Sequence, residues 1–128
     1  MNQEKLIHVA KEMRDKSYAP FSKYTVGASV KTEDGSIIGG CNVESASYGL
    51  TCCAERIALY NTISQGFLKI KAMAVASENG GFPCGACRQV IWELCGDIPI
   101  LIIDNQNKIK ETSSQALLPD AFDKNNLT

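Results

Sequence analysis

Histidine is almost absent from this chain of 128 residues, and neither sign of charge is in excess. The sole histidine, His8, is far in sequence from the cysteine motifs described below, so we interpret it as an ordinary helix residue. The 13 basic and 14 acidic residues are spread along the chain and give a net charge of −1. A polyanion needs a clustered basic surface, so we expect no nucleic-acid partner.

Long apolar runs are also missing. No stretch reaches the roughly 20 residues of a membrane span, and the first residues are polar, so we expect no membrane association and a cytoplasmic location. In such a reducing compartment, the six cysteines should be free thiols and metal ligands rather than disulfides. Repeats, low-complexity tracts and linkers are lacking too, and the length predicts a single domain, residues 1–128.

Two short cysteine motifs carry the chemical information. Cys84 and Cys87 have the Cys-x-x-Cys spacing that lets two thiolates bind one zinc ion, and Cys53 is a candidate third ligand close to Glu55. Three protein ligands leave one position of a tetrahedral zinc open, which is typical of catalytic sites. A glutamate beside that position is the pattern of zinc nucleobase deaminases, in which the carboxylate moves protons.

Other interpretations remain open for these motifs. A Cys-x-x-Cys pair alone is also typical of a redox dithiol or of a structural zinc knuckle, and a non-enzymatic zinc module is the competing class. A fourth ligand would have to come from Cys41, Cys52 or Cys95. We expect none of these, because Cys52 should point away from its neighbour and the other two lie in apolar segments. Glu55 favours the enzyme, since a structural site has no use for a carboxylate.

The apolar pattern predicts an α/β fold with a mixed sheet and helices packed on it. The expected elements are a helix from Asn2 to about Lys16, strands Thr25 to Lys31 and Ile37 to Cys41 around an Asp34-Gly35 turn, a helix from Cys53 to Gly66, a strand Lys71 to Ala76, a helix from the second motif to Gly96, strands Ile98 to Ile103 and Lys108 to Glu111, and a short helix before Leu118.

Both cysteine motifs should therefore lie at helix starts. Unpaired N–H groups and the positive end of the helix dipole lower the pKa of a thiol there and stabilise thiolates. Three thiolates give zinc a formal charge of −1, and Arg56 is our candidate for donating hydrogen bonds to the sulfurs. We expect Arg88 to stabilise a structural contact instead.

With these motifs the chain closely resembles the small zinc-dependent cytidine deaminases that act on free nucleosides. The resemblance covers nearly the whole chain. It rests on Tyr18-Ala19-Pro20-Phe21-Ser22, Gly40-Cys41-Asn42-Val43-Glu44, Ala46-Ser47-Tyr48-Gly49, Cys53-Ala54-Glu55-Arg56, Pro83-Cys84-Gly85-Ala86-Cys87-Arg88-Gln89-Val90 and Leu117-Leu118-Pro119-Asp120-Ala121-Phe122.

The resemblance implies a three-layer αβα fold with a mixed five-stranded sheet, and hydrolytic deamination of cytidine and deoxycytidine in pyrimidine salvage. It also implies a homotetramer with shared active sites, in which Glu55 moves the protons. The substrate-binding residues that it suggests are Asn42 and Glu44 for the ribose hydroxyls, Tyr24 beside the base, Ala54, and, reaching the sites of neighbouring subunits, Ala46, Tyr48 and Phe122.

Two departures from the family pattern stand out. The loop of residues 77–83 is shorter than usual, with Phe82 where a small polar residue is common, and Tyr24 replaces the usual phenylalanine. We expect the added hydroxyl to lie near the substrate, where it could alter sugar preference. Related deaminases of blasticidin S share the zinc motif, but the segment from Asn42 to Tyr48 fits the nucleoside enzymes better. A polynucleotide-editing deaminase would need a basic channel.

Overall fold

A mixed sheet of five strands forms the centre of the protein, whose residues 2–127 we describe from a computed structural model. The elements in chain order are α1 (Asn2–Arg14), β1 (Val26–Thr32), β2 (Ile37–Cys41), η1 (Tyr48–Leu50), α2 (Ala54–Ser64), β3 (Ile70–Ser77), α3 (Gly85–Cys95), β4 (Pro99–Ile103), β5 (Ile109–Ser113), α4 (Ser114–Leu117) and η2 (Lys124–Leu127).

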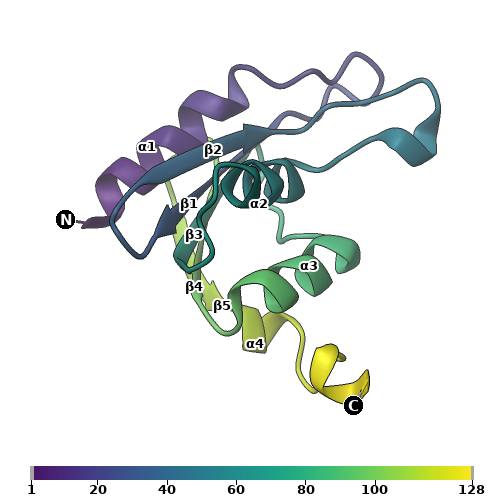
Figure 1. Cartoon of the computed structure of the whole chain (residues 1–128). Coiled ribbons are helices and arrows are strands. Elements are labelled where there is room, and N and C mark those ends of the chain that lie inside the picture. Colours follow the sequence, from purple (N-terminus) through teal and green to yellow (C-terminus); the bar gives the residue numbers. More distant parts are fainter. Residues whose placement is uncertain (1, 128) are drawn as a thin grey trace.

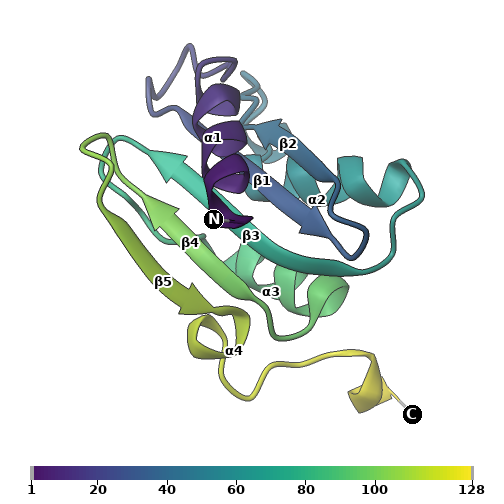
Figure 2. The ribbon, with the colours of Figure 1, turned by 90° about the vertical axis from the view of Figure 1, so that its left-hand side faces the viewer.

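The strand order is β2-β1-β3-β4-β5, with β3 and β4 parallel and the other neighbours antiparallel. Helix α1 covers one face of the sheet, and α2 and α3 lie side by side on the other (Figure 1; Figure 2). The predicted three-layer arrangement is thus confirmed. None of the helices within residues 2–127 has the length and apolarity that crossing a bilayer requires.

Element boundaries differ from the prediction at a few ends. Helix α1 stops at Arg14 because the next three amides, from Asp15 to Ser17, each bond to the carbonyl three residues earlier, which tightens the last turn. Strand β5 runs on to Ser113, which pairs with Pro99. The 3₁₀ turns η1 and η2 lie in segments for which no helix or strand was predicted.

Strand β3 explains how the sheet accommodates a helix layer on each face. Its side chains alternate between the faces, and all but one of its residues are buried. Ala72, Ala74 and Ala76 pack beside Leu6 and Ala10 of α1. Met73 and Val75 belong to the larger core on the other face, under α2 and α3. Small residues on one face therefore let α1 lie close to the sheet.

Two glycines of the hairpin set the helix distances more directly. A Cβ atom added at Gly27 would lie 2.1 Å from the carbonyl oxygen of Ala10, in the backbone of α1. On the opposite face, a Cβ atom at Gly40 would lie 2.4 Å from the backbone nitrogen of Ala58 in α2. Both helices therefore rest on bare backbone at these points, and the second contact fixes the helix that begins beside Cys53.

We expect Gly27→Ala to destabilise the protein by at least about 1–3 kcal/mol, because the new methyl group meets helix backbone that cannot rotate away. Chemical denaturation at a fixed protein concentration measures the change. Gly49→Ala is the matched control, since a Cβ atom there meets nothing within 4 Å. Equal stability of the two variants would contradict this view of the α1 contact.

Candidate metal centre and substrate cavity

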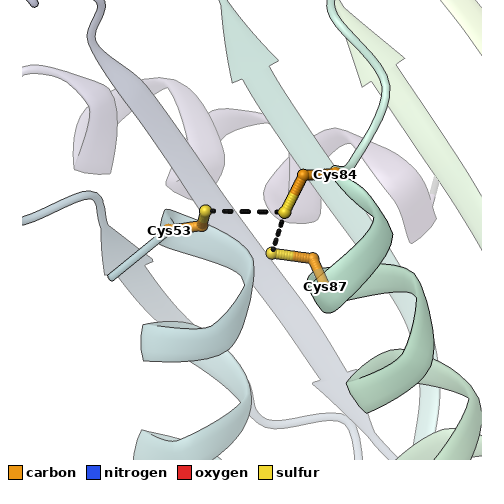
Figure 3. Close-up of side chains that lie close together, drawn as sticks. All are labelled: Cys53, Cys84 and Cys87. Carbon is orange, nitrogen blue, oxygen red and sulfur yellow. Dashed lines mark hydrogen bonds between the residues drawn. The ribbon is translucent and has the colours of Figure 1, made fainter. Parts of the chain in front are cut away.

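Three cysteine side chains converge where α2 and α3 begin. Cys53 and Cys84 are the N-cap residues of these helices, and Cys87 lies buried in the first turn of α3. Figure 3 shows their sulfur atoms turned toward one another from the two helix ends. The Cys84 sulfur lies 3.8 Å from that of Cys53 and 3.4 Å from that of Cys87.

This geometry fits a tetrahedral zinc ion. Zinc–sulfur bonds of about 2.3 Å place the sulfurs of a tetrahedral site about 3.8 Å apart, and these three sulfurs all lie within 4.8 Å of one another. The structure thus brings together the three cysteines that the sequence singled out. No other group of three potential ligands occurs within residues 2–127. Burial raises the pKa of the remaining thiols, Cys41, Cys52 and Cys95, as for small buried side chains.

Arg56 supplies positive charge at the thiolate cluster. Its Nη2 atom donates to the Cys53 sulfur at 3.5 Å. A hydrogen bond from Cys87, with a further one from Arg56, lowers the pKa of Cys53 to about 5 although burial opposes the shift. The Nε atom of Arg56 is buried and finds no acceptor within the described part of the chain. The contact agrees with the role in charge compensation that we expected for this arginine.

Glu55 occupies the first turn of α2, beside the cysteines. Only 5% of its surface is accessible to solvent, and burial raises the pKa of its carboxyl group to about 7. A carboxyl group with such a pKa can both accept and release a proton near neutral pH, which is what general acid–base catalysis requires. The structure therefore sets a carboxyl group with a pKa near neutrality beside the cysteines.

A cavity of about 290 Å³ opens above these groups. Its lining includes Cys53, Glu55 and Cys84, together with the polar side chains of Asn42 and Glu44. The remaining wall residues include Ser22, Tyr24, Val26, Thr51, Cys52, Ala54, Val75, Ser77, Gly81 and Phe82. Ligand pockets usually span about 300–1,000 Å³, so the cavity within one chain is small for a nucleoside.

Hydrogen bonds hold the side chains of Asn42 and Glu44 firmly in the cavity wall. The Asn42 oxygen accepts hydrogen bonds from Val26 N at 3.0 Å and from the Ser17 hydroxyl, while its amide donates to Tyr24 O at 2.8 Å. One amide hydrogen of Asn42 is left for a ligand. Glu44 accepts from the amides and the hydroxyl of the segment around Ser22, and the Ser22 hydroxyl is the largest cause of its lowered pKa. An ionised carboxylate facing the cavity is a good acceptor for hydroxyl groups.

Ser22 was not identified from the sequence as part of the site. It contacts Glu44 from far along the chain, and no local pattern marks such a pairing. The two departures noted in the sequence also meet here, since the Tyr24 hydroxyl donates to Asn79 in the loop of residues 77–83 and Phe82 lines the cavity. The hydroxyl of Tyr24 thus contacts the loop.

Three of the expected substrate-binding residues stay outside the cavity of their own chain. Ala46 is exposed, as are Tyr48 and Phe122, with 83% and 56% of their surfaces accessible, and none of the three lines the cavity. Ala54 is fully buried and does line it.

Arg88 and His8 match their expected structural roles. Arg88 donates to the carbonyls of Pro83 and Leu117, at 2.6 and 3.1 Å, which ties the start of α3 to α4. His8 lies exposed on α1, 3.5 Å from Glu12, and takes no part in the cavity.

Comparison with known proteins assigns this arrangement to a family. Residues 1–102 match the family model described as the cytidine and deoxycytidylate deaminase zinc-binding region. The chain belongs to this family. A cytidine deaminase of Sporosarcina psychrophila is 45% identical over 131 residues, which cover 100% of this chain and 96% of the relative.

Solved structures agree with the deaminase assignment. A cytidine deaminase from Burkholderia pseudomallei matches with a TM-score of 0.90 at 45% identity, covering 95% of this chain and 100% of that one. A cytidine deaminase from Mycobacterium tuberculosis matches with a TM-score of 0.81 at 36% identity, covering 95% and 98%. The mixed sheet with helices on both faces is thus the fold of this deaminase family.

The cysteine geometry predicts that purified protein carries about one zinc ion per chain. Cys84→Ala should lose most of that zinc, because two sulfurs cannot replace the three-ligand site. Metal analysis of dialysed protein measures it. Cys41→Ala is the control, since Cys41 lies outside the cluster and donates to Lys16 O. Full zinc occupancy in Cys84→Ala would refute the ligand assignment.

Proposed function

We propose that this protein catalyses the zinc-dependent hydrolytic deamination of cytidine and deoxycytidine to uridine and deoxyuridine. The observation that carries the proposal is the buried Glu55 beside three converging thiols, in the lining of a cavity that also includes Asn42 and Glu44. Cys53, Cys84 and Cys87 would hold the metal. The names of the related proteins support cytidine as the substrate.

Zinc held by these sulfurs would act as a Lewis acid that lets water lose a proton near neutral pH. Glu55 takes that proton and delivers it to N3 of the cytosine ring, and it then moves the second proton of the same water to the amino group that leaves as ammonia. Water adds its oxygen at C4, so cytidine and water become uridine and ammonia. Burial of Glu55 keeps its pKa close to the working pH, which serves both directions of transfer.

The polar side chains of Asn42 and Glu44 in the cavity wall suit the hydroxyl groups of a sugar. Asn42 retains an amide donor, and Glu44 is an ionised acceptor held by three hydrogen bonds from the segment of residues 21–22. We assign these groups to the ribose hydroxyls, and Tyr24 and Ala54 to the walls beside the base. Arg56 would offset the charge of the thiolates from its position on Cys53.

An ultraviolet assay on cytidine, deoxycytidine, cytosine and cytidine monophosphate tests the proposal. We expect turnover of the first two nucleosides. A deaminase of another aminopyrimidine nucleoside such as blasticidin S is less well supported, because the relatives cited above are named cytidine deaminases. Turnover of none of the four substrates would favour that enzyme or a non-enzymatic zinc module.

Replacing Glu55 by glutamine should leave zinc content and fold unchanged while lowering the turnover rate by at least about 10²-fold, because the amide has a similar shape but cannot carry the proton. Turnover numbers and metal analysis on the same preparation check this. Glu33→Gln, an exposed change in the hairpin turn, is the control. Near-native turnover of Glu55→Gln would mean that another group moves the proton.

The sugar assignment predicts that free cytosine is a poor substrate, because it leaves the polar groups assigned to the ribose without partners. Glu44→Ala should lower kcat/KM for cytidine about 10–100-fold, the cost of losing hydrogen bonds to a charged group. The loss on cytosine should be much smaller. Equal losses on both substrates would place the sugar elsewhere.

The small cavity and the three exposed residues also support a shared site. We propose a homotetramer in which Ala46, Tyr48 and Phe122 complete the cavities of neighbouring subunits. All six cysteines are free thiols, which suits pyrimidine salvage in a reducing cytoplasm. The balanced charge gives no reason to expect a nucleic-acid partner.

Sharing predicts complementation between inactive chains. Glu55→Gln chains provide an intact Phe122, and Phe122→Ala chains provide an intact Glu55. Unfolding and refolding the two together should restore part of the activity, because some sites then combine both intact residues. A lack of recovery despite proven mixed assembly, or full activity of a monomer in sedimentation, would contradict the shared site.

A further inference from the structure

The Tyr24 hydroxyl makes one side-chain hydrogen bond to the loop of residues 77–83. It donates a hydrogen bond of 2.7 Å to the Asn79 side-chain oxygen, 55 residues further along the chain. A Cβ atom added at Gly81 would lie 2.9 Å from the same hydroxyl, so the loop backbone also passes close to it. The tyrosine ring and the loop thus form adjoining walls of one cavity.

Other contacts also brace this loop, beginning with the Asn105 amide, which donates to the Glu78 carbonyl at 3.1 Å. The Ser77 hydroxyl accepts from the amides of Gly80 and Gly81, at 3.1 and 3.2 Å. At the far side, the Lys110 ammonium lies 5.8 Å from the centre of the Phe82 ring, within the range of a cation–π contact. The Asn79 side chain, between these supports, makes its described contact with Tyr24.

We infer that the Tyr24 hydroxyl positions the loop of residues 78–82, and with it the Phe82 wall, for substrate binding. The inference rests on the proposed function and goes beyond it. Phe82 is separated from Cys84 by one residue, and both line the cavity, so the wall that Phe82 forms lies close to a proposed zinc ligand. Loss of the tether should therefore weaken the fit of the substrate while leaving the proton carrier and the sulfurs in place.

Tyr24→Phe removes the donor and keeps the ring. It should raise KM for cytidine about 3–10-fold, the usual worth of one hydrogen bond, with kcat changed less than about twofold. Asn79→Ala should do the same, and the double variant should be no worse than either single one, because both remove one bond. Asn79→Asp keeps an acceptor oxygen and should retain a KM near that of the unaltered chain.

Gly81→Ala tests the same contact sterically. In the native background, the new methyl group should push the Tyr24 hydroxyl away and raise KM. In Tyr24→Phe the hydroxyl is gone, so Gly81→Ala should raise KM no further. Tyr60→Phe, at an exposed tyrosine of α2 outside the cavity, is the control for the loss of a hydroxyl.

A measurement without substrate separates this inference from the proposed function. Amide hydrogen exchange of Gly80 and Gly81 should be about 3–10-fold faster in Tyr24→Phe and in Asn79→Ala, and unchanged in Asn79→Asp. If the native chain deaminates no cytidine, the exchange data still report on the tether. Native exchange rates in Tyr24→Phe, or a native KM with an active enzyme, would overturn the inference.

Discussion

The convergence of three thiols at two helix N-termini is the constraint on which the rest of the structure depends. Thiolates repel one another, and here the dipoles of α2 and α3 and the Arg56 guanidinium offset their charge. The two helices must therefore start side by side on one face of the sheet. Bare backbone at Gly40 lets α2 lie close enough to β2 for that.

The same arrangement explains where the groups of the proposed site come from. Glu55 is buried because it begins a helix packed on the sheet, and burial gives it a pKa near neutrality. Asn42 and Glu44 follow β2 and are fixed by the segment that connects α1 with β1. The proposed zinc chemistry thus depends on the helix layer, and the proposed contacts with the sugar depend on the loops beside β2.

Local patterns in the sequence sufficed for the elements and the sulfur cluster. The Cys-x-x-Cys spacing and the helix starts are encoded within a few residues, so the sequence indicated the three cysteines and Glu55 as one site. Gly66 and Gly96 indicated the helix ends, because glycine readily adopts the positive φ angles found there. Contacts between distant side chains were not predictable. Neither the Tyr24–Asn79 bond nor the Ser22–Glu44 bond leaves any periodic trace in the sequence, which suggested only that the Tyr24 hydroxyl would lie near the substrate.

The central claim is that three cysteines hold zinc and leave one position open beside Glu55. X-ray absorption at the zinc edge counts the neighbours of the metal directly and needs no assumption about substrate. We expect three sulfur atoms at about 2.3 Å and one lighter neighbour at about 2.0–2.1 Å. A shell of four sulfur atoms would mean a closed structural site with a fourth cysteine such as Cys52, and would contradict the catalytic account.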